Sequence, residues 1–260
     1  MSQQVFIPFR LRDGGDLRRS ANLEVVQAWW YGHGFDPVIV SDGGTGDEQF
    51  NRHKAYNTAI RENPGTDMFV FTEADMLIHP DQINEAMRQA AAAPGLVVPF
   101  TEYRYLSDLV TGFIRDTYHD MSTTELAEWW GLPANDIHSV FDMRADSVMK
   151  NGKSIGAVNV LSRETLKATG GFTEATSGNW YDDNIIEEAF QFLTRKTRWV
   201  HGPAVHLYHL PGWQGDHLTD ADKAATAHNK QVLDAVRRMI RAKDRPGVRR
   251  MMSHRVRSRR

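Results

Sequence analysis

The chain has 260 residues, of which 41% are hydrophobic and 25% charged, as in an ordinary soluble globular protein with one large core. It has no cysteine, which excludes a disulfide framework and a thiolate metal site. The net charge of −2 hides an asymmetry, because residues 237–260 hold eleven Lys or Arg and one acid, which leaves 20 basic and 32 acidic residues before them. With no run of 18 apolar residues and no visible secretory signal, we expect no transmembrane segment and a cytoplasmic location.

Strands and helices alternate over the first hundred residues. Short apolar runs that end at Gly, Pro or Asp predict strands, and apolar residues at helical spacing predict helices. The predicted strands are residues 5–9, 37–40, 69–71 and 96–98, and the helices between them are residues 16–30, 51–60 and 81–93. This alternation predicts an α/β fold whose sheet binds ligands at the carboxyl ends of its parallel strands.

The second half of the chain is less regular. The segment Ser-Thr-Thr-Glu at 122–125 predicts a capped helix start. Further strands are predicted at 155–161, 199–200 and 205–208, and further helices after Ser162, at 185–193 and at 219–241. No internal repeat or linker is present, so we expect one domain followed by a basic tail.

Glu73 and Asp75 directly follow the third predicted strand. A charge at the end of a buried strand needs a partner, and a divalent cation that carries an anionic ligand best explains two acids there. Because side chains alternate along an extended segment, we expect both carboxylates on one face. Such oxygen ligands suit Mn²⁺ or Mg²⁺ together with substrate phosphates. The alternative is that the two acids cap the next helix or face solvent.

Three further positions at the same predicted edge carry charge. Arg52 and Lys54 open the second helix and could neutralise a diphosphate, although this segment alone fits a solvated basic face better. Asp42 ends the second strand, where it could contact a nucleobase or ribose, or form only a turn. Arg10 follows the first strand.

Asp182 and Asp183 begin a predicted helix after Gly-Asn-Trp-Tyr. One Asp would serve as a helix cap, but two exceed that need, and a carboxylate beside a reacting hydroxyl can act as general base. His206 and His209 lie at the end of a short strand and are candidate metal ligands. Because they would point to opposite faces of a strand, we expect only one to bind.

The motifs of several large enzyme classes are absent from the sequence. There is no Gly-x-Gly-x-x-Gly after a strand, no P-loop, no His-Glu-x-x-His and no Gly-x-Ser-x-Gly. These absences argue against NAD enzymes, P-loop NTPases, zincins and α/β-hydrolases.

In their order and spacing, these segments resemble the GT-A glycosyltransferases, in particular the family 2-like and galactosyltransferase-like branches. The similarity covers residues 3–210, and the matching segments are 5–10, 41–44, 50–57, 71–75, 170–174, 180–184 and 206–209. The resemblance implies a Rossmann-like, mixed, mainly parallel sheet flanked by helices, with a basic helical tail. It implies a domain of residues 1–236, with a nucleotide-binding half 1–100 and an acceptor-binding half 101–236, followed by the tail 237–260.

The resemblance also implies roles for individual residues. It assigns nucleotide contacts to Arg10 and Asp42, diphosphate contacts to Arg52 and Lys54, the metal ion to Asp75, Glu73, His209 and His206, and the catalytic base to Asp183 beside Asp182. Of the two histidines, it favours His209. Glu73 departs from the Asp expected at the first acidic position. The acceptor pocket is expected within 101–155, where Tyr103, Tyr105, Trp129 and Trp130 lie.

The implied reaction is the transfer of a hexose from a nucleoside-diphosphate sugar, expected to be a UDP-sugar, to an acceptor hydroxyl. It would require Mn²⁺ or Mg²⁺ and is expected to invert the anomeric carbon, with retention as the alternative. The acceptor could be a glycan, a protein or modified DNA. One alternative is a nucleotidyltransferase, which shares the sheet and the metal site but needs no base. Another is a nucleic-acid-binding protein that acts through the tail, which suits an anionic partner.

Overall fold

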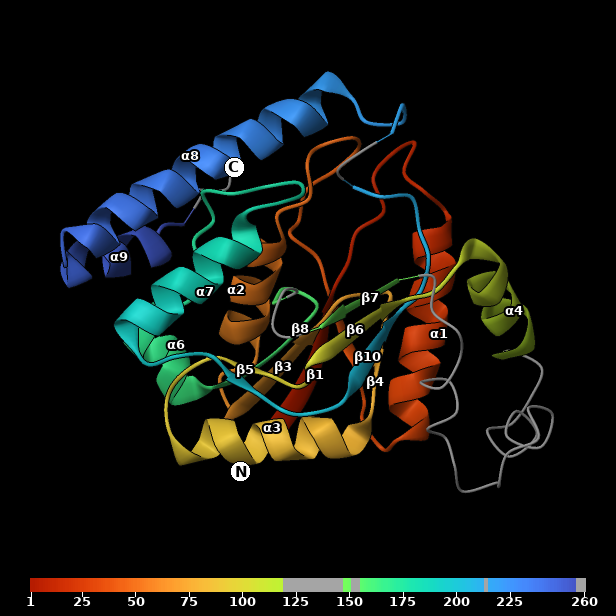
Figure 1. The fold of residues 1–260 in the computed structure, drawn as a ribbon, viewed down its shortest axis with the longest axis horizontal. Coiled ribbons are helices and arrows are strands. Elements are labelled where there is room, and N and C mark those ends of the chain that lie inside the picture. The colour runs from red at the N-terminus through yellow and green to blue at the C-terminus, as the bar shows by residue number, and fades with distance from the viewer. Residues whose placement is uncertain (119–146, 151–154, 213–214, 256–260) are drawn as a thin grey trace.

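The structure, a computed structural model, describes residues 1–118, 147–150, 155–212 and 215–255 (Figure 1). The helix start predicted at 122–125, with Trp129 and Trp130, lies outside these residues.

The main sheet has six strands in the order β2-β1-β3-β8-β5-β9. Their bounds are β1 (Gln3–Pro8), β2 (Val38–Val40), β3 (Met68–Thr72), β5 (Val97–Val98), β8 (Val158–Ser162) and β9 (Arg198–Trp199). β1 pairs in parallel with β2 and β3, whereas β8 is antiparallel to both β3 and β5. Every residue of β3 and β8 is buried, which explains their nearly continuous apolar sequences. The predicted mixed, mainly parallel sheet is therefore confirmed.

A second sheet of four strands, in the order β4-β10-β6-β7, was mostly not predicted. Its strands are β4 (Met76–Ile78), β6 (Glu102–Tyr105), β7 (Ser147–Lys150) and β10 (Pro203–His206). β4 starts immediately after Asp75 and pairs antiparallel with β10. Glu73 therefore precedes a turn at Ala74 and Asp75 that joins β3 to β4, and the expectation that the two acids share one face of an extended segment is wrong.

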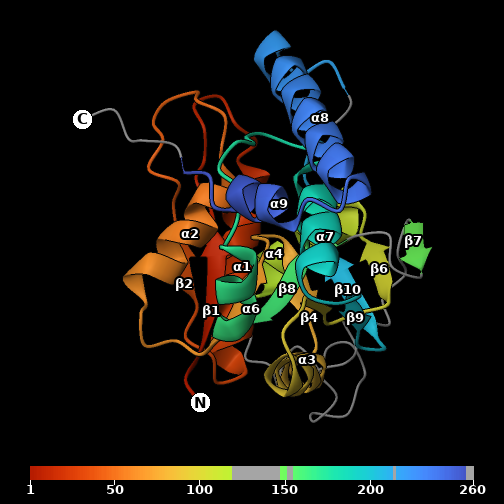
Figure 2. The same cartoon turned by 90° about the vertical axis from the view of Figure 1, so that its left-hand side faces the viewer.

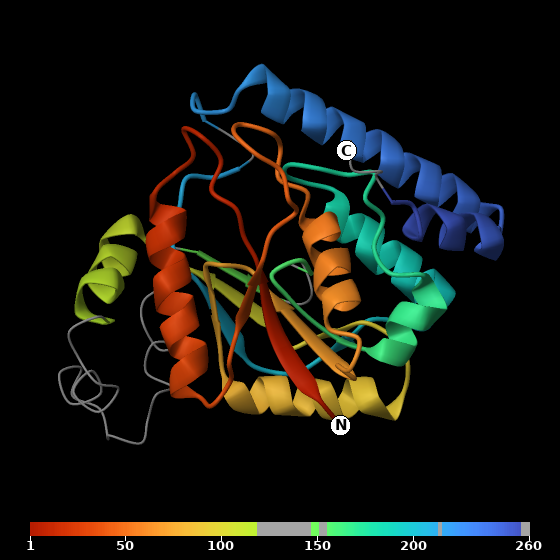
Figure 3. The ribbon, with the colours of Figure 1, turned by 180° about the vertical axis from the view of Figure 1, so that it is seen from behind.

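Helices cover the sheets on several sides. They are α1 (Arg18–Gly32), α2 (Arg52–Glu62), α3 (Pro80–Ala92), α4 (Asp108–Tyr118), α6 (Arg163–Thr169), α7 (Asp182–Leu193), α8 (Asp220–Arg241) and α9 (Arg245–Met252). Seen from behind, α1 and α2 flank β1, and α4 lies beyond α1 (Figure 3). None of the helices in the described part of the chain is both long and apolar enough to cross a membrane.

The C-terminal helices α8 and α9 pack against α7 (Figure 2). A capping box between Thr219 and Asp222 starts α8, as expected for the helix predicted at 219–241. Val248 and Met252 of α9 have no exposed area. Residues 245–252 of the predicted tail are thus folded onto the rest of the protein.

Four arginines of the predicted tail bind groups of the preceding fold. Arg237 pairs with Glu188 at 2.6 Å. Arg245 and Arg249 donate to backbone carbonyls at the C-terminal ends of α7 and α6, where the helix dipole favours a cation. Arg255 donates to the carbonyls of Gly170 and Phe172. Much of the tail's positive charge therefore acts within the molecule.

Replacing Met252 by Ala should lower the free energy of unfolding by about 2–5 kcal/mol, because it removes a fully buried side chain. Urea unfolding followed by circular dichroism measures this change. Arg250→Ala on the exposed side of α9 is the control and should stay close to wild type. Equal stability of the two variants would show that α9 is not packed on the protein in solution.

Candidate active site

The predicted site residues gather at one edge of the main sheet. Arg10, Asp42 and Glu73 follow the carboxyl ends of the parallel strands β1, β2 and β3. In the second sheet, β10 ends at His206 and pairs with β4, which follows Asp75 directly. This is the edge at which open α/β sheets bind their ligands.

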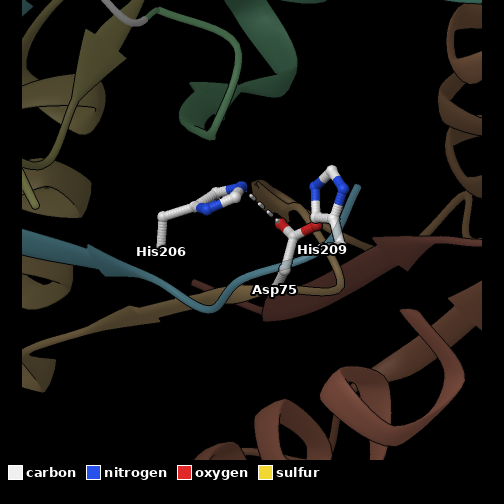
Figure 4. Close-up of side chains that lie close together, drawn as sticks. All are labelled: Asp75, His206 and His209. Atoms are coloured by element: carbon white, nitrogen blue, oxygen red, sulfur yellow. Dashed lines mark ion pairs between the residues drawn. The ribbon is translucent and has the colours of Figure 1, made fainter. Parts of the chain in front are cut away.

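Asp75, His206 and His209 form a group whose potential ligand atoms all lie within 4.8 Å of one another (Figure 4). The Nε2 atom of His209 lies 3.0 Å from Asp75 Oδ2, and that of His206 lies 3.8 Å from Asp75 Oδ1. β10 ends at His206, so His209 lies on the loop that follows. The rule that successive side chains of a strand point to opposite faces therefore does not apply to this pair. Both imidazoles therefore reach Asp75, whereas the sequence favoured only one.

The chemistry of this group fits a divalent cation. Asp75 is 1% exposed, and its Oδ1 atom has no hydrogen-bond partner among the described residues. A buried polar atom left unpaired is costly, and a bound cation would satisfy it. One carboxylate with two imidazoles suits Mn²⁺ better than Mg²⁺, which prefers oxygen ligands alone.

The protonation of the three side chains supports the same interpretation. Burial lowers the pKa of His206 to about 4, so this ring is neutral near pH 7. The Nδ1 atom of His209 lies 2.7 Å from the carbonyl oxygen of Leu210, which holds the proton on Nδ1 and leaves Nε2 free to bind a metal. Although burial acts to raise the pKa of Asp75, the two histidines hold it below its ordinary value.

The loop that carries His209 is held by α1 and α4. Leu210 donates its N–H to Asp16 Oδ2 at 2.8 Å, and Asn22 donates to the carbonyl of Tyr208 at 3.1 Å. Thr111 accepts the N–H of Tyr208 at 2.8 Å. Sequence reasoning missed these contacts because they join residues about a hundred or more positions apart.

Arg52 forms a second group with three carboxylates. Its guanidinium lies 2.5 Å from Glu73 Oε1 and 2.5 Å from Asp182 Oδ2, and it also pairs with Asp183. Glu73 therefore turns toward Arg52, and the metal-ligand group found among the described residues does not include it. The arrangement joins the start of α2 to the start of α7.

The two aspartates of α7 differ in environment. Burial raises the pKa of Asp183 to about 7, and the negative charges of Asp182 and Glu73 add to this rise against the opposing charge of Arg52. For Asp182, the charge of Arg52 outweighs burial and lowers the pKa. The side chain of Asp183 is 37% exposed and that of Asp182 only 7%. Asp183 is thus the group that can both reach a substrate and exchange a proton.

A strained turn sets the start of α7. Trp180 and Tyr181 have φ angles of 73° and 66°, which residues other than Gly rarely adopt. The buried Asn229 of α8 holds this turn by donating to the carbonyls of Ser177 at 2.9 Å and Trp180 at 3.0 Å. Trp180 remains 47% exposed beside the two aspartates.

Gly156 packs directly against this group. A Cβ atom at position 156 would overlap the carboxylate of Asp183. Glycine is therefore required for Asp183 to adopt its observed place. The Trp-Tyr-Asp-Asp segment was visible in the sequence, whereas neither Asn229 nor Gly156 carried a local signal.

Arg10 and Asp42 form an ion pair at 2.8 Å. Asp42 also accepts the N–H of Asn51 at 2.8 Å, and Asn51 caps α2 by accepting the N–H of Lys54 at 2.9 Å. This chain of contacts orients the start of α2 and with it Arg52. Within the described part of the chain, the side chain of Lys54 belongs to neither carboxylate group.

The aromatic residues expected in an acceptor pocket separate into two kinds. Tyr103 is buried and Tyr105 is half-buried, and their ring centroids lie 5.6 and 5.1 Å from that of His206. Both tyrosines therefore border the metal-ligand group, and Tyr105 is the more accessible of the two.

No protein-family model and no curated protein matches the sequence. Among solved structures, the fold is similar to that of a variant of Drosophila β1,4-galactosyltransferase 7 in complex with manganese, UDP-galactose and xylobiose. The two share 11% identity over 86% of this chain and 79% of that chain, with a TM-score of 0.50. A glucosyl-3-phosphoglycerate synthase from Mycobacterium tuberculosis, solved with Mn²⁺, UDP-glucose and phosphoglyceric acid, shares 14% identity over 90% of this chain and 80% of that chain, with a TM-score of 0.48. The chain therefore has the GT-A fold, which the order of its sequence segments predicted.

Proposed function

We propose that the chain is a Mn²⁺-dependent glycosyltransferase that moves a hexose from a nucleoside-diphosphate sugar to an acceptor hydroxyl. The observation that carries this proposal is the presence of two distinct groups at one sheet edge. A buried carboxylate with two imidazoles suits a metal ion, and a partly exposed carboxylate with a raised pKa suits a base. The galactosyltransferase of the same fold was solved with manganese and UDP-galactose, which supports Mn²⁺ and a UDP-sugar.

Asp75, His206 and His209 would hold the metal ion. When bound, the ion supplies Lewis-acid stabilisation of the departing nucleoside diphosphate. Arg10 and Asp42 would contact the nucleoside from the ends of β1 and β2, and Lys54 would face the diphosphate. Glu73 would act through Arg52, because its carboxylate binds that guanidinium.

Asp183 would remove the proton of the acceptor hydroxyl as the oxygen attacks the anomeric carbon. The new bond joins that oxygen to the anomeric carbon, and the bond to the diphosphate breaks on the opposite face, which gives inversion. Arg52 holds Asp183 in place and keeps Asp182 ionised. The exposed face of Trp180 would pack against the acceptor.

The rate of transfer should rise with pH through about 7. The pKa of Asp183 is raised to about 7, and a base acts only when it is ionised, so activity is lost below that value and levels off above it. A profile of kcat/KM against pH, measured with saturating Mn²⁺, tests this. A rate that does not change between about pH 5 and 8 would contradict the role of Asp183.

A panel of nucleotide sugars, incubated with Mn²⁺ and scored for release of nucleoside diphosphate, tests the proposed function. We expect release from at least one donor and loss of release in EDTA. If no donor is bound or hydrolysed and EDTA changes nothing, the proposal fails. A nucleotidyltransferase would instead release pyrophosphate from a nucleoside triphosphate and would remain active after Asp183→Asn.

The nucleic-acid-binding alternative has less support. Four arginines of the tail bind groups within the molecule, and the remaining described basic residues of the tail are the exposed Arg238, Arg241, Lys243 and Arg250. Binding of duplex DNA that weakens steeply with salt and is lost when residues 237–260 are removed would favour that alternative.

A further inference from the structure

The turn before α7 holds two adjacent residues in a backbone conformation that favours glycine. Trp180 and Tyr181 both have positive φ angles, and Tyr181 is the residue at which α7 begins. The side chain of Tyr181 makes no capping hydrogen bond to the helix. A residue other than glycine stays in this conformation only where surrounding contacts impose it. The turn therefore needs a support from elsewhere in the fold.

Asn229 of α8 provides that support. Its fully buried amide donates to the carbonyls of Ser177 at 2.9 Å and Trp180 at 3.0 Å, and it accepts the N–H of Ser177 at 3.2 Å. Thr226, one turn earlier on the same helix, donates to the carbonyl of Asn179 at 3.3 Å. One side chain thus joins both ends of the turn, and α8 binds the carbonyls of residues 177, 179 and 180.

The packing of α8 does not explain an amide at this position. Asn229 lies on the same buried face of the helix as Val232, Leu233 and Val236, and α8 packs against α7. The three apolar side chains can dock the helix without it. A polar group is buried at little loss of stability only when it is hydrogen-bonded. The hydrogen bonds to the turn are therefore what the amide contributes.

The geometry of the turn determines where Asp183 lies. Tyr181 comes two residues before Asp183, so a change in its backbone angles would rotate the first residues of α7. Asp183 has little room to adjust, because a Cβ atom at Gly156 would overlap its carboxylate and Arg52 pairs with it on α2. A small shift of the turn would thus separate the carboxylate from its observed position.

We propose that Asn229 is a positioning residue for Asp183, because it holds the strained turn from which α7 starts. The proposal rests on the proposed function, in which Asp183 is the base. It makes α8 a part of the reacting unit as well as a helix that covers α7. A reacting group displaced by about 1 Å can lose about 100-fold in rate. The effect of Asn229 is therefore expected in kcat.

Urea unfolding tests the hold on the turn without using activity. Tyr181→Gly and Tyr181→Ala remove the same side chain, but only glycine adopts a positive φ without strain. With Asn229 present, Tyr181→Gly should have the higher midpoint of unfolding. With Asn229→Ala the turn can relax, so the advantage of glycine should disappear. If the advantage is absent with Asn229, or equal in both backgrounds, the proposal is overturned.

Kinetics test the consequence for the reaction. Asn229→Ala should lower kcat by about 10- to 100-fold, whereas the KM of the donor and the dissociation constant of Mn²⁺ should stay close to wild type. Asn229→Asp should lose as much, because it keeps the shape but cannot donate to the two carbonyls. Val236→Ala is the matched control, since it removes another fully buried side chain from the same face of α8. It should lower the midpoint of unfolding and keep kcat.

A milder variant is needed if both substitutions at position 229 prevent folding. Thr226→Val keeps the shape of the side chain and removes the hydrogen bond to Asn179. A fall in kcat of about 2- to 10-fold, as expected for one hydrogen bond, would support the proposal. A kcat equal to that of wild type would overturn it.

The remaining outcomes separate this proposal from the proposed function. If Val236→Ala loses as much kcat as Asn229→Ala, the loss follows stability and the positioning role is overturned. It is also overturned if Asn229→Ala keeps its kcat, and the proposed function then stands. If wild type releases nucleoside diphosphate from no donor, the proposed function fails and the role in catalysis fails with it. The unfolding comparison still shows whether Asn229 holds the turn.

Discussion

Replacing Asp183 by Asn is expected to lower the rate of sugar transfer about 100- to 10,000-fold, because an amide cannot accept the proton of the acceptor hydroxyl. The amide oxygen can still accept a hydrogen bond from Arg52, so the start of α7 should keep its structure. The dissociation constants of Mn²⁺ and UDP should therefore change little. Steady-state rates and calorimetry on the same preparation measure both effects.

Asp182→Asn is the matched control for this variant. Its carboxylate is nearly inaccessible, and its negative charge contributes to the raised pKa of Asp183. Removing that charge should lower the pKa of Asp183 and move the acid side of the pH profile to lower pH. If Asp182→Asn abolishes transfer at every pH while Asp183→Asn remains active, the base has been assigned to the wrong residue.

Replacing Asp75 by Asn is expected to weaken Mn²⁺ binding by more than about 100-fold and to remove activity with it. Asp75 is the only anion among the three grouped ligands, and two neutral imidazoles cannot balance a dication. Electron paramagnetic resonance of free Mn²⁺ measures the loss directly.

Glu73→Gln provides the matched control for the metal site, because Glu73 is an acid two residues away that binds Arg52 instead. It should keep nearly the wild-type affinity for Mn²⁺. If Glu73→Gln loses the metal and Asp75→Asn keeps it, the acid that binds the metal is Glu73. This residue is among the metal ligands expected from the sequence.

The main sheet could be predicted because its central strands carry their own signal. β3 is apolar at nearly every position, and it ends at charged residues, which a buried strand does not tolerate without partners. The second sheet could not be predicted in the same way. β4 has three residues and forms only by pairing with β10, more than a hundred positions later.

The site shows the same division between local and distant signals. Asp75, Asp183 and the two histidines follow recognisable segments, and the structure places them at one sheet edge. The partners of Arg52 depend on how α7 docks against α2, which no local pattern determines.

Anomalous X-ray diffraction from crystals soaked in MnCl₂ and UDP would test the account most directly. One manganese peak is expected about 2.0–2.3 Å from a carboxylate oxygen of Asp75 and from Nε2 of both His206 and His209. A peak bound by Glu73 or Asp183, or no ordered manganese at this edge of the sheet, would contradict it.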